Sequence, residues 1–67
     1  MFNGRRVTFT KDARSYMTAD QYREVLAGQN STFRSDATLT VIYDHEDQAI
    51  RAARFLMNKD VPYVQRG

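Results

Sequence analysis

The sequence predicts an α+β fold of two layers, a three- to four-stranded sheet with both helices packed on one of its faces. Two segments alternate between apolar and polar residues, and two others have the apolar spacing of helices. Their order along the chain is strand, helix, strand, helix, strand. Two short helices cannot cover both faces of a sheet, so we expect the second face to stay partly open. A chain of 67 residues predicts one domain, residues 1–67.

The first strand is predicted at residues 5–10, "RRVTFT". Val7 and Phe9 fall on one face of this segment, and Arg6, Thr8 and Thr10 fall on the other. We therefore expect a half-buried strand. The following "KDAR" is expected to turn the chain, and "SYMT" could extend a short hairpin arm.

The first helix is predicted between Thr18 and Gly28. Thr18 and Gln21 have the spacing of a capping box, in which each residue accepts a hydrogen bond from the backbone of the other. Met17 and Tyr22 have the spacing of a hydrophobic staple across the same helix start. Gly28 is expected to end the helix in a left-handed conformation.

A loop is predicted at residues 29–38, which are polar and rich in turn-forming residues apart from Phe33. The next segment, "TLTVIYD", has strong β-branched content and is expected to be a central strand, because Ile42 makes its outer face partly apolar. The last strand is predicted at residues 61–65, "VPYVQ". Pro62 cannot donate a ladder hydrogen bond, which favours an edge strand or the beginning of a strand.

The second helix is predicted to run from Asp44, as its cap, to about residue 58. At about 100° per residue, one stripe carries the expected core residues Ala49, Ile50, Ala53, Leu56 and Met57. Phe55 falls outside this stripe, on the flank beside Arg51. It could be covered by the loop that carries Phe33, or it could be a contact anchor for a partner, flanked by Arg51 and Arg54.

Composition argues against catalysis and against bound metals. The chain has no cysteine and one histidine, His45, and its three glycines are too scattered to form a phosphate-binding loop. No serine lies in a nucleophile-elbow context. We therefore expect no catalytic residue, no metal, no cofactor and no enzymatic activity.

The charge and hydropathy of the chain bear on its partners and its location. A net charge of +2 argues against a DNA mimic, which needs a dense negative surface. The chain lacks the apolar run of about 18 residues that a membrane span requires, and its N-terminus lacks the apolar core of a secretory signal. We expect no membrane contact and a cytoplasmic location.

Arginine dominates the positive charge, with eight arginines and two lysines. Arginine and tyrosine are enriched at interface cores, although codon bias in a GC-rich genome gives the same excess. Four cations gather near the N-terminus around Phe9 and Tyr16; they are Arg5, Arg6, Lys11 and Arg14. This pattern is compatible with nucleic-acid binding on a basic sheet or with a solvated edge strand.

These observations favour a small protein-binding module whose partner is a protein or a protein–nucleic-acid complex. The alternative is a small basic nucleic-acid-binding or transcription-modulating protein. A homodimer joined through the last strand is a further possibility. The residues predicted to contact a partner are Arg5, Arg6, Arg14, Phe33, Arg51, Arg54, Phe55 and Tyr63.

Residues 40–65, "TVIYDHEDQAIRAARFLMNKDVPYVQ", resemble in pattern the strand, acidic-capped helix and strand of several small phage-encoded inhibitors. These include the host RNA polymerase inhibitor of T7-like phages and some anti-CRISPR proteins. The resemblance carries no functional residue over to this chain. It implies a stoichiometric inhibitor that acts in the host cytoplasm and blocks a surface of a nucleic-acid-processing or defence complex.

Overall fold

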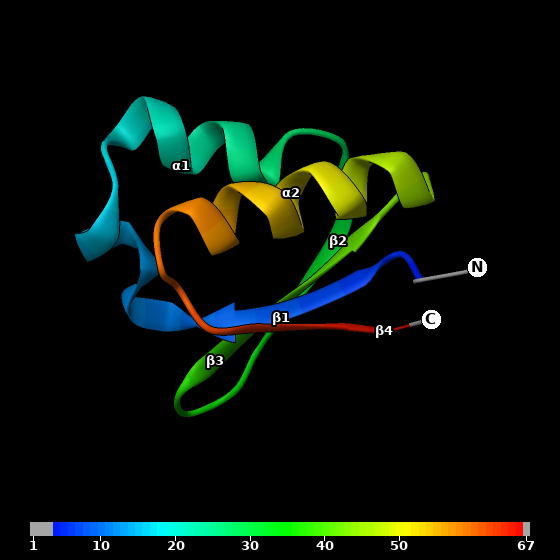
Figure 1. Cartoon of the computed structure of the whole chain (residues 1–67). Helices are drawn as coiled ribbons and strands as arrows, with labels where there is room; N and C mark the ends of the chain where they lie inside the picture. The colour runs from blue at the N-terminus through cyan, green and yellow to red at the C-terminus, as the bar shows by residue number, and fades with distance from the viewer. Residues whose placement is uncertain (1–3, 67) are drawn as a thin grey trace.

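Four strands form one antiparallel sheet with helices on one of its faces (Figure 1). The computed structural model describes residues 4–66. Its elements are β1 (Arg6–Thr10), the 3₁₀ helix η1 (Lys11–Tyr16), α1 (Ala19–Leu26), β2 (Gln29–Arg34), β3 (Thr38–Tyr43), α2 (Glu46–Asn58) and β4 (Tyr63–Arg66). The predicted α+β fold, a sheet of up to four strands with two main helices packed on it, is confirmed.

The sheet has the strand order β2-β3-β1-β4. With α1 between β1 and β2 and α2 between β3 and β4, this is the connectivity of a split βαβ arrangement. β3 lies between β2 and β1, so the prediction of a central strand there is confirmed. β4 follows Pro62 and pairs only with β1, as expected of an edge strand.

Three local predictions are wrong. Residues 29–34 form the edge strand β2 instead of a loop, and β1 is a central strand, so it is not a solvated edge. The segment after β1 forms η1 instead of a turn and a hairpin arm, because Thr10 accepts a hydrogen bond from the Asp12 backbone and starts a helical turn. η1 carries Ala13 into the core.

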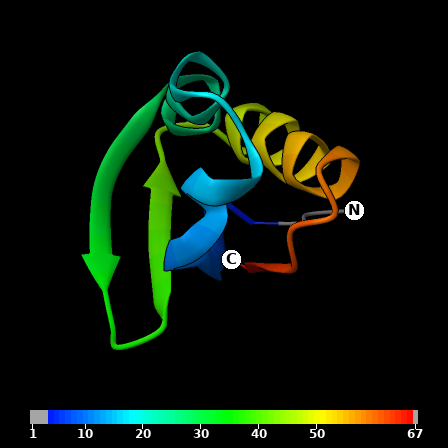
Figure 2. The same ribbon diagram turned by 90° about the vertical axis from the view of Figure 1, so that its left-hand side faces the viewer.

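The two faces of the sheet differ, as the alternation predicts. The face toward the helices carries the buried side chains Val7, Phe9, Leu39, Val41 and Tyr43. Figure 2 shows the helices on this side only, with β2 curving away at one edge of the sheet. Phe9 is 1% exposed, so it is a core residue and is not available for stacking on a ligand.

The start and end of α1 match the prediction. The side chain of Thr18 accepts from the Gln21 backbone, and the side chain of Gln21 accepts from the Thr18 backbone at 2.8 Å. Gly28 has a φ of +83° and follows the helix, which is the conformation expected of a glycine at that place. The buried Tyr43 hydroxyl donates to the carbonyl of Val25 and so ties β3 to α1.

The second helix begins one residue later than predicted, at Glu46, with His45 and not Asp44 at the N-cap. The side chain of Gln48 accepts from the backbone N–H of His45 at 3.1 Å. The carboxylate of Asp44 instead accepts from the amide of Asn30 at 2.8 Å, which joins the starts of α2 and β2.

The buried face of α2 is rotated from the predicted stripe. Ala49, Ala53 and Leu56 are buried as expected. Ile50 is only half-buried and Met57 is 57% exposed, whereas Ala52, outside the predicted stripe, is 3% exposed. Phe55 is half-buried and packs against the core. The prediction that Met57 lies in the core is therefore wrong.

The position of α1 explains this rotation. Arg51 of α2 makes an ion pair of 2.5 Å with Glu24 of α1, and Gln48 lies against Gly28. The flank of α2 that carries Phe55 therefore faces α1. Phe33 lies on the other face of the sheet, so it does not cover Phe55.

Within residues 4–66, no helix has both the length and the apolar character needed to cross a membrane.

Candidate functional site

The helices leave one face of the sheet uncovered. Residues on alternate positions of all four strands contribute to it: Arg6, Thr8, Thr10, Ser31, Phe33, Thr38, Thr40, Ile42, Val64 and Arg66. These residues include two arginines and no carboxylate. We refer to these ten residues as the open face.

Two arginines lie directly opposite each other on this face. Arg6 of β1 and Arg66 of β4 are register partners, and both are exposed. Like charges in directly opposed positions destabilise a sheet. Within residues 4–66, neither guanidinium makes an ion pair with a carboxylate that would offset the repulsion. The pair is therefore available to an anionic group from outside the chain.

Apolar side chains lie beside this charge. Phe33 is 58% exposed and Val64 is 48% exposed, on the two edge strands. Phe33 and Ile42 line a hollow of about 460 Å³ together with Arg6 and Arg66. The hydroxyls of Thr8 and Thr40 hydrogen-bond to each other at 2.8 Å in the middle of the face. The face thus combines an exposed aromatic ring, an aliphatic side chain and paired cations.

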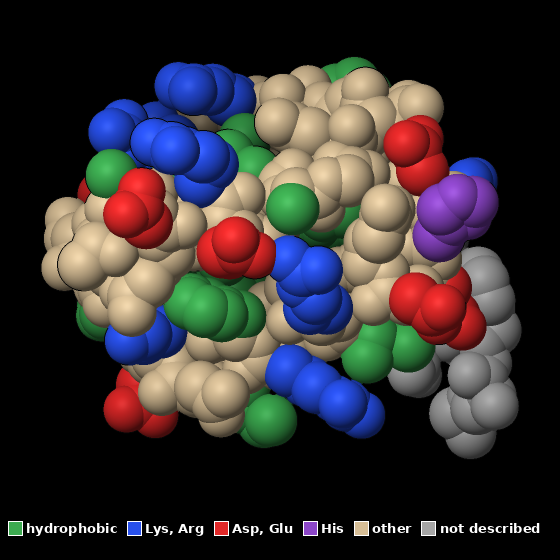
Figure 3. All heavy atoms as spheres, turned by 90° about the horizontal axis from the view of Figure 1, so that it is seen from above, with side chains coloured by type: hydrophobic (Ala, Val, Ile, Leu, Met, Phe, Trp, Pro, Cys, Tyr) green, Lys and Arg blue, Asp and Glu red, His purple; other side chains and the backbone are tan. Residues whose placement is uncertain are grey.

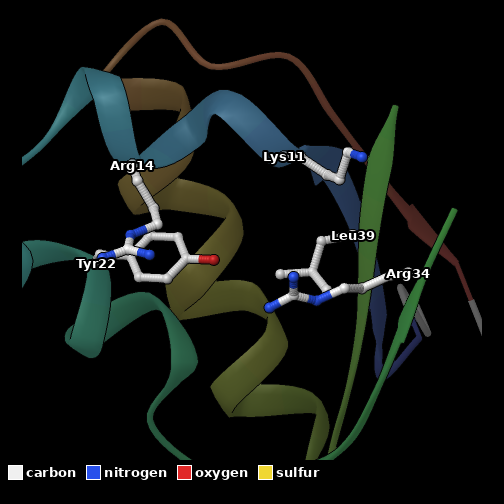
Figure 4. Close-up of a pocket in the computed structure, with 5 residues that line it drawn as sticks. All are labelled: Lys11, Arg14, Tyr22, Arg34 and Leu39. Atoms are coloured by element: carbon white, nitrogen blue, oxygen red, sulfur yellow. The ribbon is translucent and has the colours of Figure 1, made fainter. Parts of the chain in front are cut away.

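A second basic surface lies on the other side of β2. β2 curves away from α1 (Figure 2), and side chains of both elements line a groove between them. At one end of this groove a cavity of about 140 Å³ is lined by Lys11, Arg14, Tyr22, Arg34 and Leu39 (Figure 4). The groove continues along β2 as a hollow of about 260 Å³ that includes Gln29 and Thr32. We call this the α1–β2 groove.

Cations from two elements line the α1–β2 groove. Lys11 and Arg14 come from η1, and Arg34 is the last residue of β2. The guanidinium of Arg14 lies over the ring of Tyr22, with 5.5 Å between its Cζ atom and the ring centroid. None of the described residues that line the groove carries a carboxylate.

The outer surface of the helix layer carries charges of both signs. Figure 3 looks onto this layer and shows Lys and Arg side chains gathered at one corner, with acidic side chains interspersed elsewhere. Arg51 is neutralised by Glu24. Arg54 shares a shallow hollow with Asp47. On α2, Arg51 therefore has an acidic partner and Arg54 has an acidic neighbour.

The structure separates the eight predicted contact residues. Arg6 and Phe33 meet on the open face, and Arg14 lies in the groove. Arg51 and Arg54 are exposed on α2.

The other three predicted residues have structural contacts. Arg5 donates to the backbone carbonyl of Asp44 at 3.3 Å, and Phe55 and Tyr63 pack against the core. Contact with a partner stays a prediction for all eight. The last strand is an edge, as a homodimer through it requires, and that state also stays a prediction.

The sequence pattern did not indicate that Lys11, Tyr22 and Arg34 line one groove, or that Arg66 lies beside Arg6 on the open face. Arg66 could have been placed on the open face by continuing the alternation of the last strand. Arg34 could not, because the prediction of a loop at residues 29–38 gave its side chain no direction.

Among the residues that the structure describes, no three His, Asp or Glu side chains are grouped so as to hold a metal ion. No protein-family model, curated protein or solved structure matches this chain.

Proposed function

We propose that this chain is a non-catalytic binding module that docks through its open face on an acidic surface of a larger protein. The observation that carries this proposal is the Arg6–Arg66 couple, which makes no ion pair within residues 4–66, next to exposed Phe33. Buried centres of interfaces are enriched in aromatic residues and arginine, and these residues dominate binding free energies. The partner therefore offers carboxylates to the arginines and an apolar pocket to Phe33.

The central strands favour a protein over a nucleic acid on this face. Base stacking on an open sheet uses aromatic side chains of the central strands. Here those strands present Thr8 and Thr40, whose hydroxyls are engaged with each other. The one aromatic ring on the face, Phe33, lies on an edge strand.

The proposed activity is stoichiometric inhibition. A partner held against the open face loses access to the surface that the module covers. By resemblance to the phage-encoded inhibitors, the proposed target is a component of a nucleic-acid-processing or defence complex, encountered in the host cytoplasm.

Affinity capture tests this proposal. The immobilised wild-type chain is expected to retain a target from a bacterial lysate, and the purified target is expected to lose activity at a 1:1 ratio. Phe33→Ala and Arg66→Glu should each weaken binding about 30-fold, the effect of losing a hot-spot residue. The matched control is Arg23→Glu, since Arg23 is exposed on α1 and makes only a long, surface ion pair of 3.7 Å with Asp20.

Equal retention of the target by wild type, Phe33→Ala and Arg66→Glu would exclude the open face as the docking surface. Loss of the target with Arg54→Glu alone would instead assign docking to the outer surface of α2.

A further inference from the structure

We propose that the α1–β2 groove binds the backbone of a single-stranded nucleic acid. Lys11, Arg14 and Arg34 line the groove without a carboxylate among its walls. Within residues 4–66, none of the three makes an ion pair. Three cations gathered without an ion-pair partner among residues 4–66 repel one another, and a polyanion removes this repulsion while releasing its own counterions.

The arrangement of the cations favours an extended polyanion over a single phosphate. Figure 4 shows Arg14 over one end of Tyr22, with Arg34 reaching in from β2 on the other side of the cavity. The cations are thus spread along the groove instead of converging on one point. Successive phosphates of one strand match such a row.

The remaining walls suit the rest of a nucleotide. The Tyr22 ring, already paired with Arg14, supplies aromatic surface, and Leu39 supplies apolar surface beside it. Gln29 and Thr32 add an amide and a hydroxyl farther along β2. Arginine–aromatic pairs and polar side chains beside a basic groove are the means by which proteins hold single strands.

The dimensions of the groove favour one strand over a duplex. Its two overlapping hollows, of about 140 and 260 Å³, are small concave spaces between α1 and β2. A single strand can bend into such a space, whereas the phosphates of a rigid duplex meet only the rim.

This inference does not rest on the proposed function, because the groove and the open face lie on opposite sides of β2. Loss of protein docking by Phe33→Ala should leave nucleic-acid binding intact. Either proposal can therefore fail alone.

Fluorescence anisotropy of the purified full chain with a labelled 12-nucleotide single strand tests the inference. The logarithm of the binding constant should fall with the logarithm of salt concentration at a slope of about −2, as expected for three phosphates on a single strand. Arg34→Gln should weaken binding about tenfold, because a charge-assisted hydrogen bond is lost, and should reduce the slope by about 0.7.

The matched control is Arg23→Gln, which makes the same charge change outside the groove. It should leave both the affinity and the slope within error of wild type. An equal loss in Arg23→Gln and Arg34→Gln would show diffuse attraction to the whole chain and overturn the proposal.

Two competitors define the class of ligand. A duplex of the same sequence, or an acidic phosphopeptide of matched charge, should displace the labelled strand at least tenfold less well than the unlabelled single strand. Equal or better displacement by either competitor overturns the assignment to single-stranded nucleic acid. So does the absence of binding at about 50 mM salt, where phosphate contacts are strong.

Discussion

Gly28 holds a position that another residue type could fill only with strain. Its φ of +83° is in the left-handed region, and a Cβ atom there would lie 2.4 Å from the side-chain Cδ of Gln48. Gln48 also accepts from the His45 backbone, so this one contact fixes both the end of α1 and the start of α2.

Gly28→Ala should lower the free energy of unfolding by about 1–3 kcal/mol, the cost of holding a non-glycine residue in a left-handed conformation. Urea denaturation measures the loss. In a Gln48→Ala background the loss should be smaller, because the steric part is gone and the backbone part stays. An equal loss in wild type and in the Gln48→Ala background would show that the Gln48 side chain moves away from the new Cβ atom at no energetic cost.

Tyr43 is the second residue on which the helix layer depends. Burial raises the pKa of its phenol well above the usual range, with a smaller contribution from Tyr22. The folded state therefore keeps its proton at a pH where the unfolded state has lost it. Below about pH 10, the pKa of tyrosine in the unfolded chain, the contribution of Tyr43 to the free energy of unfolding does not change with pH. Above pH 10, stability falls as the pH rises.

Tyr43→Phe should reduce stability at pH 7 by about 1–3 kcal/mol, since the buried carbonyl of Val25 loses its hydroxyl donor. The variant should also lose less stability than wild type between pH 9 and pH 11. Urea denaturation across that range gives both values. A parallel decline in the two proteins would assign the alkaline loss to other groups.

At the scale of elements, the second helix shows what periodicity can and cannot determine. Its apolar stripe correctly identified Ala49, Ala53 and Leu56. The stripe could not show that α1 lies beside the flank carrying Arg51 and Phe55, because periodicity within one helix does not reveal which other element packs against it. The helix therefore turns its buried face toward α1 and leaves Met57 outside.

Alanine substitutions distinguish the observed face from the predicted one. Phe55→Ala should lower stability by about 2 kcal/mol, somewhat less than a fully buried phenylalanine, and Met57→Ala by less than about 0.5 kcal/mol. Thermal or urea unfolding measures both. A larger loss for Met57→Ala than for Phe55→Ala would place the buried face where the sequence alone predicted it.

The sheet could be predicted only where burial gives one face a distinct composition. β1 and β3 alternate visibly, and the α1 capping box has a sequence signature, so their types were predicted correctly. β2 faces the α1–β2 groove on one side and the open face on the other. Neither face of β2 is buried in the core, so most of its residues are polar and do not alternate with apolar ones. Its strand state comes from pairing with β3, which no local pattern reveals.

At the scale of the whole molecule, positive charges gather on two surfaces, and each surface combines residues that are far apart in the sequence. The open face joins Arg6 to Arg66, and the groove joins Lys11 to Arg34. The sequence indicated the excess of arginine and the open sheet face. It could not pair residues from opposite ends of the chain, because that pairing depends on the register of β1 with β4.

The repulsion between Arg6 and Arg66 should make the stability of the molecule depend on salt concentration. Arg66→Gln should raise stability at low salt by about 0.2–1 kcal/mol, because it removes a directly opposed like-charge pair. The gain should shrink at about 1 M salt, where the repulsion is screened in wild type. Urea denaturation of Arg66→Gln and Arg23→Gln at both salt concentrations measures it. The same gain in both variants would point to net charge alone.

The central claim is that a protein partner covers the open face. Hydroxyl-radical footprinting of the chain with and without its captured partner tests it most directly. Phe33 and Met57 are exposed to similar extents, 58% and 57%, but Phe33 lies on the open face and Met57 on helix α2. We expect binding to protect the side chains of Phe33 and Val64 from oxidation and to leave Met57 as reactive as in the free chain. Protection of Met57 with unchanged oxidation of Phe33 would contradict the account and place the partner on the helix layer.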